Sequence, residues 1–331
     1  MSKSKVIYRE NFDCKALTIN AILSRVIPIS EFIWNQAGLA IYENENNLIF
    51  TPHYINEYEH LYNTANIRSI EYNLPNSELF LEKIKFILNT GSSTLVRVDI
   101  FDLPFNMYYC KHKGPHYIEI TDMENEQFFV CDHFYKYSGF VDIDIIAKAM
   151  KTRMDIEGNN EYIFHSFCTD EYSFKLDRNY LFKIMSKNNS QILGEGTVDF
   201  LDIPNHKRLV GLKTFDRFDK YLEEHFHQKG PLKGIYKSLF NLSNSRYYYS
   251  KIISKYKDDY NNIELIEDLY LDSYQNFRIA ANLVLKLRAS KKERAYLTNL
   301  KDILSSTLNI EREASKLVED FILKEGQGTT S

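Results

Sequence analysis

The chain has 331 residues, of which 44 % are hydrophobic, so it is long enough for two structural units and can bury a substantial core. Its 45 Asp and Glu residues outnumber its 41 Lys and Arg residues, which gives a formal net charge of −4. General binders of nucleic acid carry a marked basic excess, and the composition therefore argues against that class.

The sequence also argues against secretion and membrane insertion. The first residues, MSKSKVIYRENF, contain no apolar signal core, and no later stretch approaches the roughly 18 apolar residues needed to cross a bilayer. We therefore expect a cytoplasmic protein. Its four cysteines form no C-x-x-C pair and are expected to be free thiols: Cys14, Cys110, Cys131 and Cys168.

The first half of the chain mixes strand and helix patterns. Apolar residues recur at helical spacing over residues 14–25, which predicts a helix there. Apolar runs rich in β-branched and aromatic residues predict strands, and further helical spacing predicts two more helices. In chain order, the expected strands are 48–52, 67–74, 94–104, 116–123 and 127–134, and the two further helices are 76–88 and 142–153.

The second half is predicted to be mainly helical. Residues 154–160 are interpreted as a linker, and residues 161–168 have a strand-like pattern. After them, helical spacing dominates and few Gly or Pro residues interrupt it. The chain is therefore expected to be α+β, with one domain at 1–155 and a mainly helical domain at 156–331. The expected helices are 178–187, 215–228, 231–256, 262–287, 290–307 and 309–324.

Cys14 stands at the start of the first expected helix, with Asp13 or Asn11 available as its N-cap. The thiolate is the reactive form of cysteine, and the dipole and free N–H groups of a helix N-terminus favour it. The alternative is a small buried residue that only contributes to packing, and a lone cysteine at a helix start has that role more often than a catalytic one. A nucleophile would need a base nearby.

A predicted hairpin supplies that base. Alternation puts His116 on one face with Ile118 and Ile120, and Asp132 on one face with Phe128 and Val130. If Ile118 pairs with Val130, His116 lies directly opposite Asp132, and the loop is Met123-Glu124-Asn125. An acid on one ring nitrogen would orient the imidazole to accept the thiol proton, so Cys14, His116 and Asp132 are candidates for a catalytic triad.

Several segments resemble the N-terminal domain of the butirosin-type acyltransferase family, over roughly residues 8–153. The segments are CKALTINAIL from Cys14, VRVDIFDLPF at 96–105, HYIEI from His116, VCDHF at 130–134 and the helix with Ala147 and Ala149. The most specific of them is the D-x-x-x-L-P run, Asp99 to Pro104, which precedes His116 by a dozen residues.

This resemblance implies a papain-like fold with a variable, mostly helical second domain. It implies that Cys14 is the nucleophile, His116 the base and Asp132 its orienting acid. The family's activity implies transfer of an acyl or peptidyl chain from a carrier-protein thioester to an amine, in nonribosomal-peptide-like antibiotic biosynthesis. A diamine is one candidate acceptor, because the resemblance extends to amide-forming enzymes that use one. No bound cofactor is implied, since phosphopantetheine arrives on the carrier protein.

The sequence departs from papain relatives at the expected oxyanion hole. Many relatives have a Gln several residues before the nucleophile and a Gly after it, whereas Tyr8 to Asn11 and Lys15 stand here. We therefore expect the Cys14 backbone N–H and the Asn11 side chain to supply these contacts.

Two further sets of residues are candidates for binding. Asp99 and Asp102 are candidates for the amine, and turn capping is the alternative. Basic residues between 229 and 257, with no acid among them, are candidates for docking an acidic carrier protein, and a solvated basic helix is the alternative. The docking candidates are Lys229, Lys233, Lys237, Arg246 and Lys251.

The sequence is also compatible with two other functions. A papain-like cysteine peptidase or amidase would use the same triad, with water in place of the amine. A non-catalytic metabolite-binding protein would use the cleft without forming a covalent intermediate.

Overall fold

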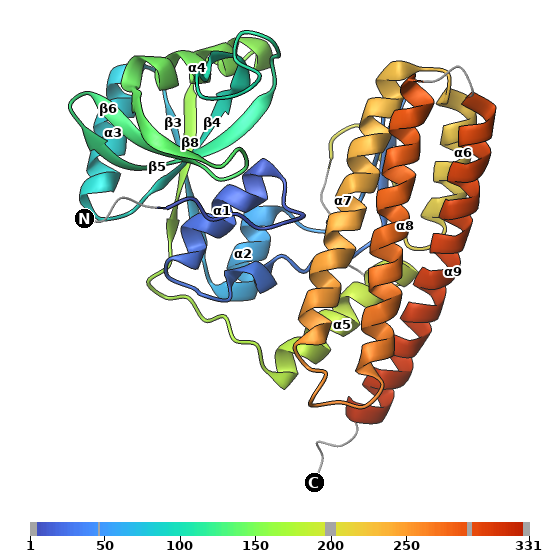
Figure 1. Cartoon of the computed structure of the whole chain (residues 1–331). Helices are drawn as coiled ribbons and strands as arrows, with labels where there is room; N and C mark the ends of the chain where they lie inside the picture. The colour runs from blue at the N-terminus through green and yellow to red at the C-terminus, as the bar shows by residue number, and fades with distance from the viewer. Residues whose placement is uncertain (1–4, 46, 196–202, 290–292, 327–331) are drawn as a thin grey trace. The chain divides into compact units, whose positions relative to one another are not determined.

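The computed structural model describes residues 5–45, 47–195, 203–289 and 293–326 (Figure 1). The chain divides into two compact units, which we call the sheet unit and the helical unit. The sheet unit comprises Met1–Glu31 with Leu61–Phe174, and the helical unit comprises Phe32–His60 with Lys175–Ser331. No helix among the described residues is both long and apolar enough to span a membrane.

This division differs from the expected boundary between residues 155 and 156. The segment expected to be a linker begins inside helix α4 (Ile143–Glu157), which ends at Gly158 with a left-handed φ of 69°. Strand β8 (Tyr162–Cys168) follows and pairs with strands of the sheet unit. Residues 32–60 belong instead to the helical unit, to which they contribute two strands.

The sheet unit is built on a six-stranded antiparallel sheet with the order β3-β8-β4-β5-β6-β7. Besides β8, its strands are β3 (Arg68–Leu74), β4 (Thr94–Asp99), β5 (Pro115–Glu124), β6 (Gln127–Asp132) and β7 (Tyr137–Asp142). Strands β4 and β6 carry nearly continuous buried residues, because both of their faces are covered. In β5, which lies between them, the buried residues fall between His116 and Ile120.

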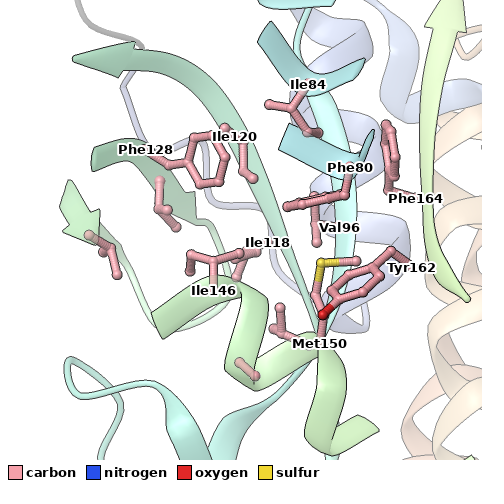
Figure 2. Packing of buried hydrophobic residues seen from close by; sticks show 14 of the residues in the cluster. Phe80, Ile84, Val96, Ile118, Ile120, Phe128, Ile146, Met150, Tyr162 and Phe164 are labelled. Atoms are coloured by element: carbon pink, nitrogen blue, oxygen red, sulfur yellow. The ribbon is translucent and has the colours of Figure 1, made fainter. Parts of the chain in front are cut away.

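Helices α3 (Ser77–Asn89) and α4 bury their apolar faces against this sheet. Asn76 begins α3 by accepting a hydrogen bond from the Leu79 backbone N–H at 2.9 Å. Phe80 of α3 and Met150 of α4 then converge on strand residues such as Val96, as Figure 2 shows. The core of the sheet unit therefore forms mostly from elements that the apolar pattern predicted, together with Val141 of β7, a strand that it did not predict.

The hairpin of β5 and β6 has a different register from the expected one. Ile120 pairs with Val130, not with Phe128, and a bulge at Thr121 shifts the pairing beyond it. The turn contains two residues, Asn125 and Glu126, which both take positive φ. Such a two-residue turn matches the twist of the strands, and it replaces the expected three-residue loop.

The helical unit contains a small antiparallel sheet of order β2-β1-β9 and long helices, of which α7, α8 and α9 run alongside one another (Figure 1). The helices expected at 290–307 and 309–324 are one helix, and residues 290–292 lie outside the described residues. The elements are β1 (Ala40–Asn44), β2 (Asn47–Thr51), α5 (Arg178–Leu193), β9 (Lys207–Val210), α6 (Thr214–His225), α7 (Lys229–Ser254), α8 (Ile263–Ala289) and α9 (Glu293–Gly326).

Four short helices complete the described elements. A 3₁₀ helix, Ile100–Asp102, follows β4, so the strand expected at 94–104 ends at Asp99. The first helix, α1, spans Cys14–Ser24 in the sheet unit, as expected. A 3₁₀ helix, Ser30–Ile33, and α2 (Glu57–Ala65) lie where the chain passes between the units. The chain is thus mixed α/β, with two antiparallel sheets and a helical C-terminal region, and this much of the expected fold class is confirmed.

Arg246 was expected among the residues that dock a carrier protein. That expectation is wrong, because Arg246 is fully buried in the helical unit. Its guanidinium binds Glu311 of α9 through two hydrogen bonds, of 2.7 and 3.0 Å. Ser273 of α8 also donates to Glu311, and the Gly38 carbonyl accepts from Arg246. Arg246 therefore joins α7, α8 and α9 from within and presents no charge to a partner.

We predict that Arg246→Met destabilises the protein by about 3–5 kcal/mol, because it leaves the Glu311 carboxylate buried without its countercharge. Urea unfolding measures the change. The double variant Arg246→Met/Glu311→Met should recover most of the loss, because it removes both charges. Equal stability of the wild type and the single variant would contradict the buried pair.

Candidate active site

The N-terminus of α1 holds Cys14 at the first helical position. Asp13 is the N-cap, and its side chain accepts a hydrogen bond from the Ala16 N–H at 2.8 Å, which settles the choice between Asp13 and Asn11. The Thr18 hydroxyl lies 2.8 Å from the Cys14 carbonyl oxygen and 3.2 Å from that of Tyr117 in β5. The first turn of α1 is therefore fixed beside the strand that carries His116.

His116 connects Cys14 to Asp132. Its Nε2 lies 2.8 Å from Asp132 Oδ2, and both side chains are buried. The Cys14 side chain is the other neighbour of the ring, because its hydrogen bonding and its charge are among the causes that raise the pKa of His116. The other oxygen of Asp132 accepts a hydrogen bond from the Tyr135 N–H at 3.0 Å. Thiol, imidazole and carboxylate thus lie together in the sheet unit, and we call these three residues the triad.

These contacts set the protonation of the imidazole. Burial lowers the pKa of His116. The hydrogen bonds and charges of Asp132 and Cys14 raise it by more than burial lowers it, so the pKa is about 9. The imidazole is therefore protonated on both nitrogens at neutral pH. That is the state in which it can stabilise a thiolate.

The pair forms although the expected register was wrong. Continuing the observed ladder from Glu119 and Cys131 places Asp132 beside Ile118, two residues from His116. A shift of two residues keeps every side chain on its face, so the pair is diagonal instead of directly opposed. A diagonal separation is within reach of an imidazole and a carboxylate.

A second buried network of hydrogen bonds, which the sequence did not indicate, lies next to the triad. Arg25, the C-cap of α1, binds both oxygens of Glu119 in β5. His133 Nε2 lies 2.9 Å from Glu119 Oε2, and its Nδ1 accepts the Ile7 N–H at 3.0 Å. These bonds lower the pKa of Glu119 even though burial, the largest effect, raises it. The acidic residue between the two apolar residues Ile118 and Ile120 is the one sign of this network in the sequence. Its partners are distant in sequence, so the pattern does not identify them.

The two aspartates expected to bind an amine have structural partners. Asp99 Oδ1 accepts hydrogen bonds from the Phe101 and Gly114 N–H groups, and Oδ2 lies 3.4 Å from Arg153. Asp102 Oδ1 pairs with Lys148 at 2.9 Å. Within the part of the chain that the structure describes, no hydrogen bond or ion pair joins either aspartate to the triad residues. The turn-capping alternative therefore accounts for Asp99.

The other expected residues fall into two groups. Asn11 takes a left-handed φ of 62°, two residues before the N-cap of α1, and is half-buried. The four lysines expected to dock a partner are exposed on α7: Lys229, Lys233, Lys237 and Lys251. The Lys251 ammonium lies 5.5 Å from the centroid of the Tyr247 ring.

Among the described residues, no group of three or more His, Cys, Asp or Glu side chains is arranged to hold a metal ion.

Comparison of the sequence with protein-family models gives no match, and neither does comparison with curated proteins. The resemblance to the butirosin-type acyltransferases therefore stays a prediction.

The pKa of His116 predicts a pH-dependent stability. Its value of about 9 in the folded protein exceeds the 6.5 of an unperturbed histidine. Stability from its protonated form is thus complete below pH 6.5 and is lost as the pH rises to 9. The free energy of unfolding should fall over this window relative to that of His116→Gln, as measured by urea unfolding at several pH values.

The variant Asp132→Asn tests the cause of this shift. It removes the carboxylate that raises the pKa, so the imidazole should titrate at lower pH in NMR spectra. An unchanged titration would contradict the role given to Asp132.

Proposed function

We propose that the protein is a cysteine-dependent acyltransferase with a papain-like sheet unit, and that it forms an amide from a carrier-protein thioester and an amine. The observation that supports this most is that His116, hydrogen-bonded to Asp132, has its pKa raised by the neighbouring Cys14 at the start of α1. The order of the residues and the resemblance described above agree with it. In this proposal, the part of the helical unit from Lys175 onward takes the place of the variable second domain of that family.

In the first step of the proposed reaction, the Cys14 thiolate attacks the carbonyl carbon of the phosphopantetheine thioester. A bond forms from that carbon to Cys14 Sγ, the bond to the pantetheine sulfur breaks, and His116 gives its proton to the departing thiolate. Backbone N–H groups at the start of α1 are suited to stabilise the intermediate's oxyanion, with Asn11 as the proposed side-chain donor.

In the second step, the amine attacks the acyl-Cys14 carbonyl. The carbon–nitrogen bond forms, the bond to Cys14 Sγ breaks, and the neutral His116 accepts the proton that the amine loses. Exchange between two thioesters is nearly balanced, so formation of the amide drives the sequence. Net synthesis requires that the amine is held near the acyl-enzyme and that water is excluded.

We predict that the protein gains the mass of one acyl group when it is incubated with an acyl-pantetheine thioester, and that Cys14→Ala abolishes the adduct. His116→Ala should slow its formation by about 100-fold or more, since it removes the group that stabilises the Cys14 thiolate and protonates the departing sulfur. Intact-protein mass spectrometry follows both reactions. Cys168→Ser is the matched control, because this second half-buried thiol lies outside the triad.

The outcome distinguishes the alternative functions. Release of the free acid at the same rate with and without an amine would indicate a peptidase or amidase. Absence of an adduct with several thioesters would favour a non-catalytic binding protein. Product formation by Cys14→Ala at the wild-type rate would refute the mechanism.

We further propose that the exposed lysines of α7 dock the carrier protein, whose surface is acidic. Lys229, Lys233 and Lys237 recur every four residues, so they lie along one side of the helix. Arg246 is excluded from this surface by its burial.

Lys233→Glu/Lys237→Glu should therefore lower the ratio of the rates with carrier-bound and free pantetheine thioesters by about tenfold at low salt. Single-turnover acylation measures both rates. Lys316→Glu, a charge reversal on the exposed side of α9, serves as the control and should leave the ratio unchanged. An equal fall in the ratio for the control would refute a localised docking surface.

A further inference from the structure

Two aromatic side chains lie against the imidazole of the proposed triad, and a third lies against one of them. The Tyr135 ring lies 5.1 Å from the His116 ring, and the Phe134 ring lies 6.2 Å from it, measured between centroids. Tyr135 also contacts the rings of Phe134 at 5.1 Å and Tyr108 at 6.1 Å. We call Tyr108, Phe134 and Tyr135 the aromatic collar.

Tyr135 lies against two members of the triad. Its ring contacts that of His116, and its backbone N–H donates to Asp132. Burial raises the pKa of Tyr135 to about 12, and the charges of Tyr108, Asp132 and Cys14 raise it as well. Phe134 and Tyr108 extend this apolar surface, because each contacts the Tyr135 ring.

The collar leaves apolar surface in contact with solvent. Tyr108 is 38 % exposed and Phe134 is 40 % exposed. Met107 and Tyr109, on the same loop as Tyr108, are exposed as well. Exposed apolar groups that gather at one place mark binding surfaces more often than scattered ones do.

The rings of the collar carry no charge of their own. Asp132 beneath them is buried and engaged by His116 and the Tyr135 N–H, and the exposed lysines Lys111, Lys113 and Lys136 flank the collar along the chain. A charged acyl group laid against the rings would lose hydration, whereas an apolar one would bury its own surface and that of the rings.

We propose that the aromatic collar is the contact surface for the acyl group carried on Cys14, and that it selects apolar acyl groups, aromatic ones included. This inference rests on the proposed acyltransferase function. It assigns Tyr108 and Phe134 to specificity, while Tyr135 both contacts the acyl group and covers His116. The chemistry of the two transfer steps is unchanged.

The test uses the full chain in a Cys110→Ser/Cys168→Ser background, in which Cys14 is the accessible thiol because Cys131 is buried. The probes are N-acetylcysteamine thioesters of acetic, succinic and phenylacetic acid. The rate of adduct formation at Cys14 is divided by the rate of each probe with N-acetylcysteine, which removes intrinsic reactivity. The phenylacetyl probe should react about tenfold or more faster than the acetyl probe, and the succinyl probe should be slowest.

Variants assign this preference to the collar. Tyr108→Ala and Phe134→Ala should each lower the phenylacetyl-to-acetyl ratio by about threefold or more, and Phe134→Leu should retain most of it. Phe86→Ala, at an exposed aromatic residue on α3, is the control and should change neither rate. Equal normalised rates in the parent protein, or a ratio that both alanine variants preserve, would overturn the proposal.

A second pair of probes separates this proposal from the proposed function. Chloroacetamide and N-benzyl chloroacetamide alkylate a thiol without acyl transfer. One outcome is that no thioester acylates Cys14, while the benzyl compound alkylates it faster than chloroacetamide does and this difference disappears in Phe134→Ala. The acyltransferase function then fails, and the apolar surface beside Cys14 stands. If thioesters acylate Cys14 without preference, the function stands and the selectivity fails.

Discussion

The arrangement of the sheet unit depends on the buried carboxylate of Glu119. A carboxylate without water needs paired charges and hydrogen bonds, and Glu119 obtains them from Arg25 at the end of α1 and from His133 just after β6. Ile7 adds the N-terminal segment to the same network. Satisfying this one group requires that three separate segments meet at β5, and the helix that carries Cys14 is one of them.

The network around Glu119 also helps to position the triad, because both involve α1 and β5. At its N-terminal end α1 contacts β5 through Thr18, and at its C-terminal end it contacts β5 through Arg25. The helix is thus held at two points along the same strand, which fixes the thiol relative to His116. Packing alone would permit α1 to slide, because apolar contacts are not directional. Directional bonds at both ends remove that freedom.

The sequence predicted most of the elements that form the core of the sheet unit, because their apolar residues follow clear periods. It also predicted that His116 and Asp132 meet. That prediction succeeded despite a wrong register, since alternation fixes the face of each residue and the register error was an even number of residues. The bulge at Thr121 and the two-residue turn could not be foreseen, because Glu126 is an unusual residue for a left-handed conformation.

Predictions from charge alone were less successful. Arg246 lies in a basic stretch, yet its position on α7 points it toward Glu311, a partner 65 residues away. Glu119 and Asp99 are likewise buried for reasons that depend on distant arginines. Helical and strand periods follow apolar residues, so a charged residue on a buried face is recognised only when its partner is known. The collar was missed because aromatic residues in loops have no period.

The bulge in the hairpin also bears on how such sites are recognised in other sequences. It accommodates one additional residue in β5, between His116 and the turn, while the strand segments nearest His116 and Asp132 remain paired. A hairpin without the bulge would have one residue fewer between the same two groups and could hold them in the same geometry. A search pattern that requires a fixed number of residues between the histidine and the aspartate would therefore separate proteins with equivalent sites. Allowing that interval to vary by one residue, while requiring that both residues keep their strand faces, follows the geometry more closely.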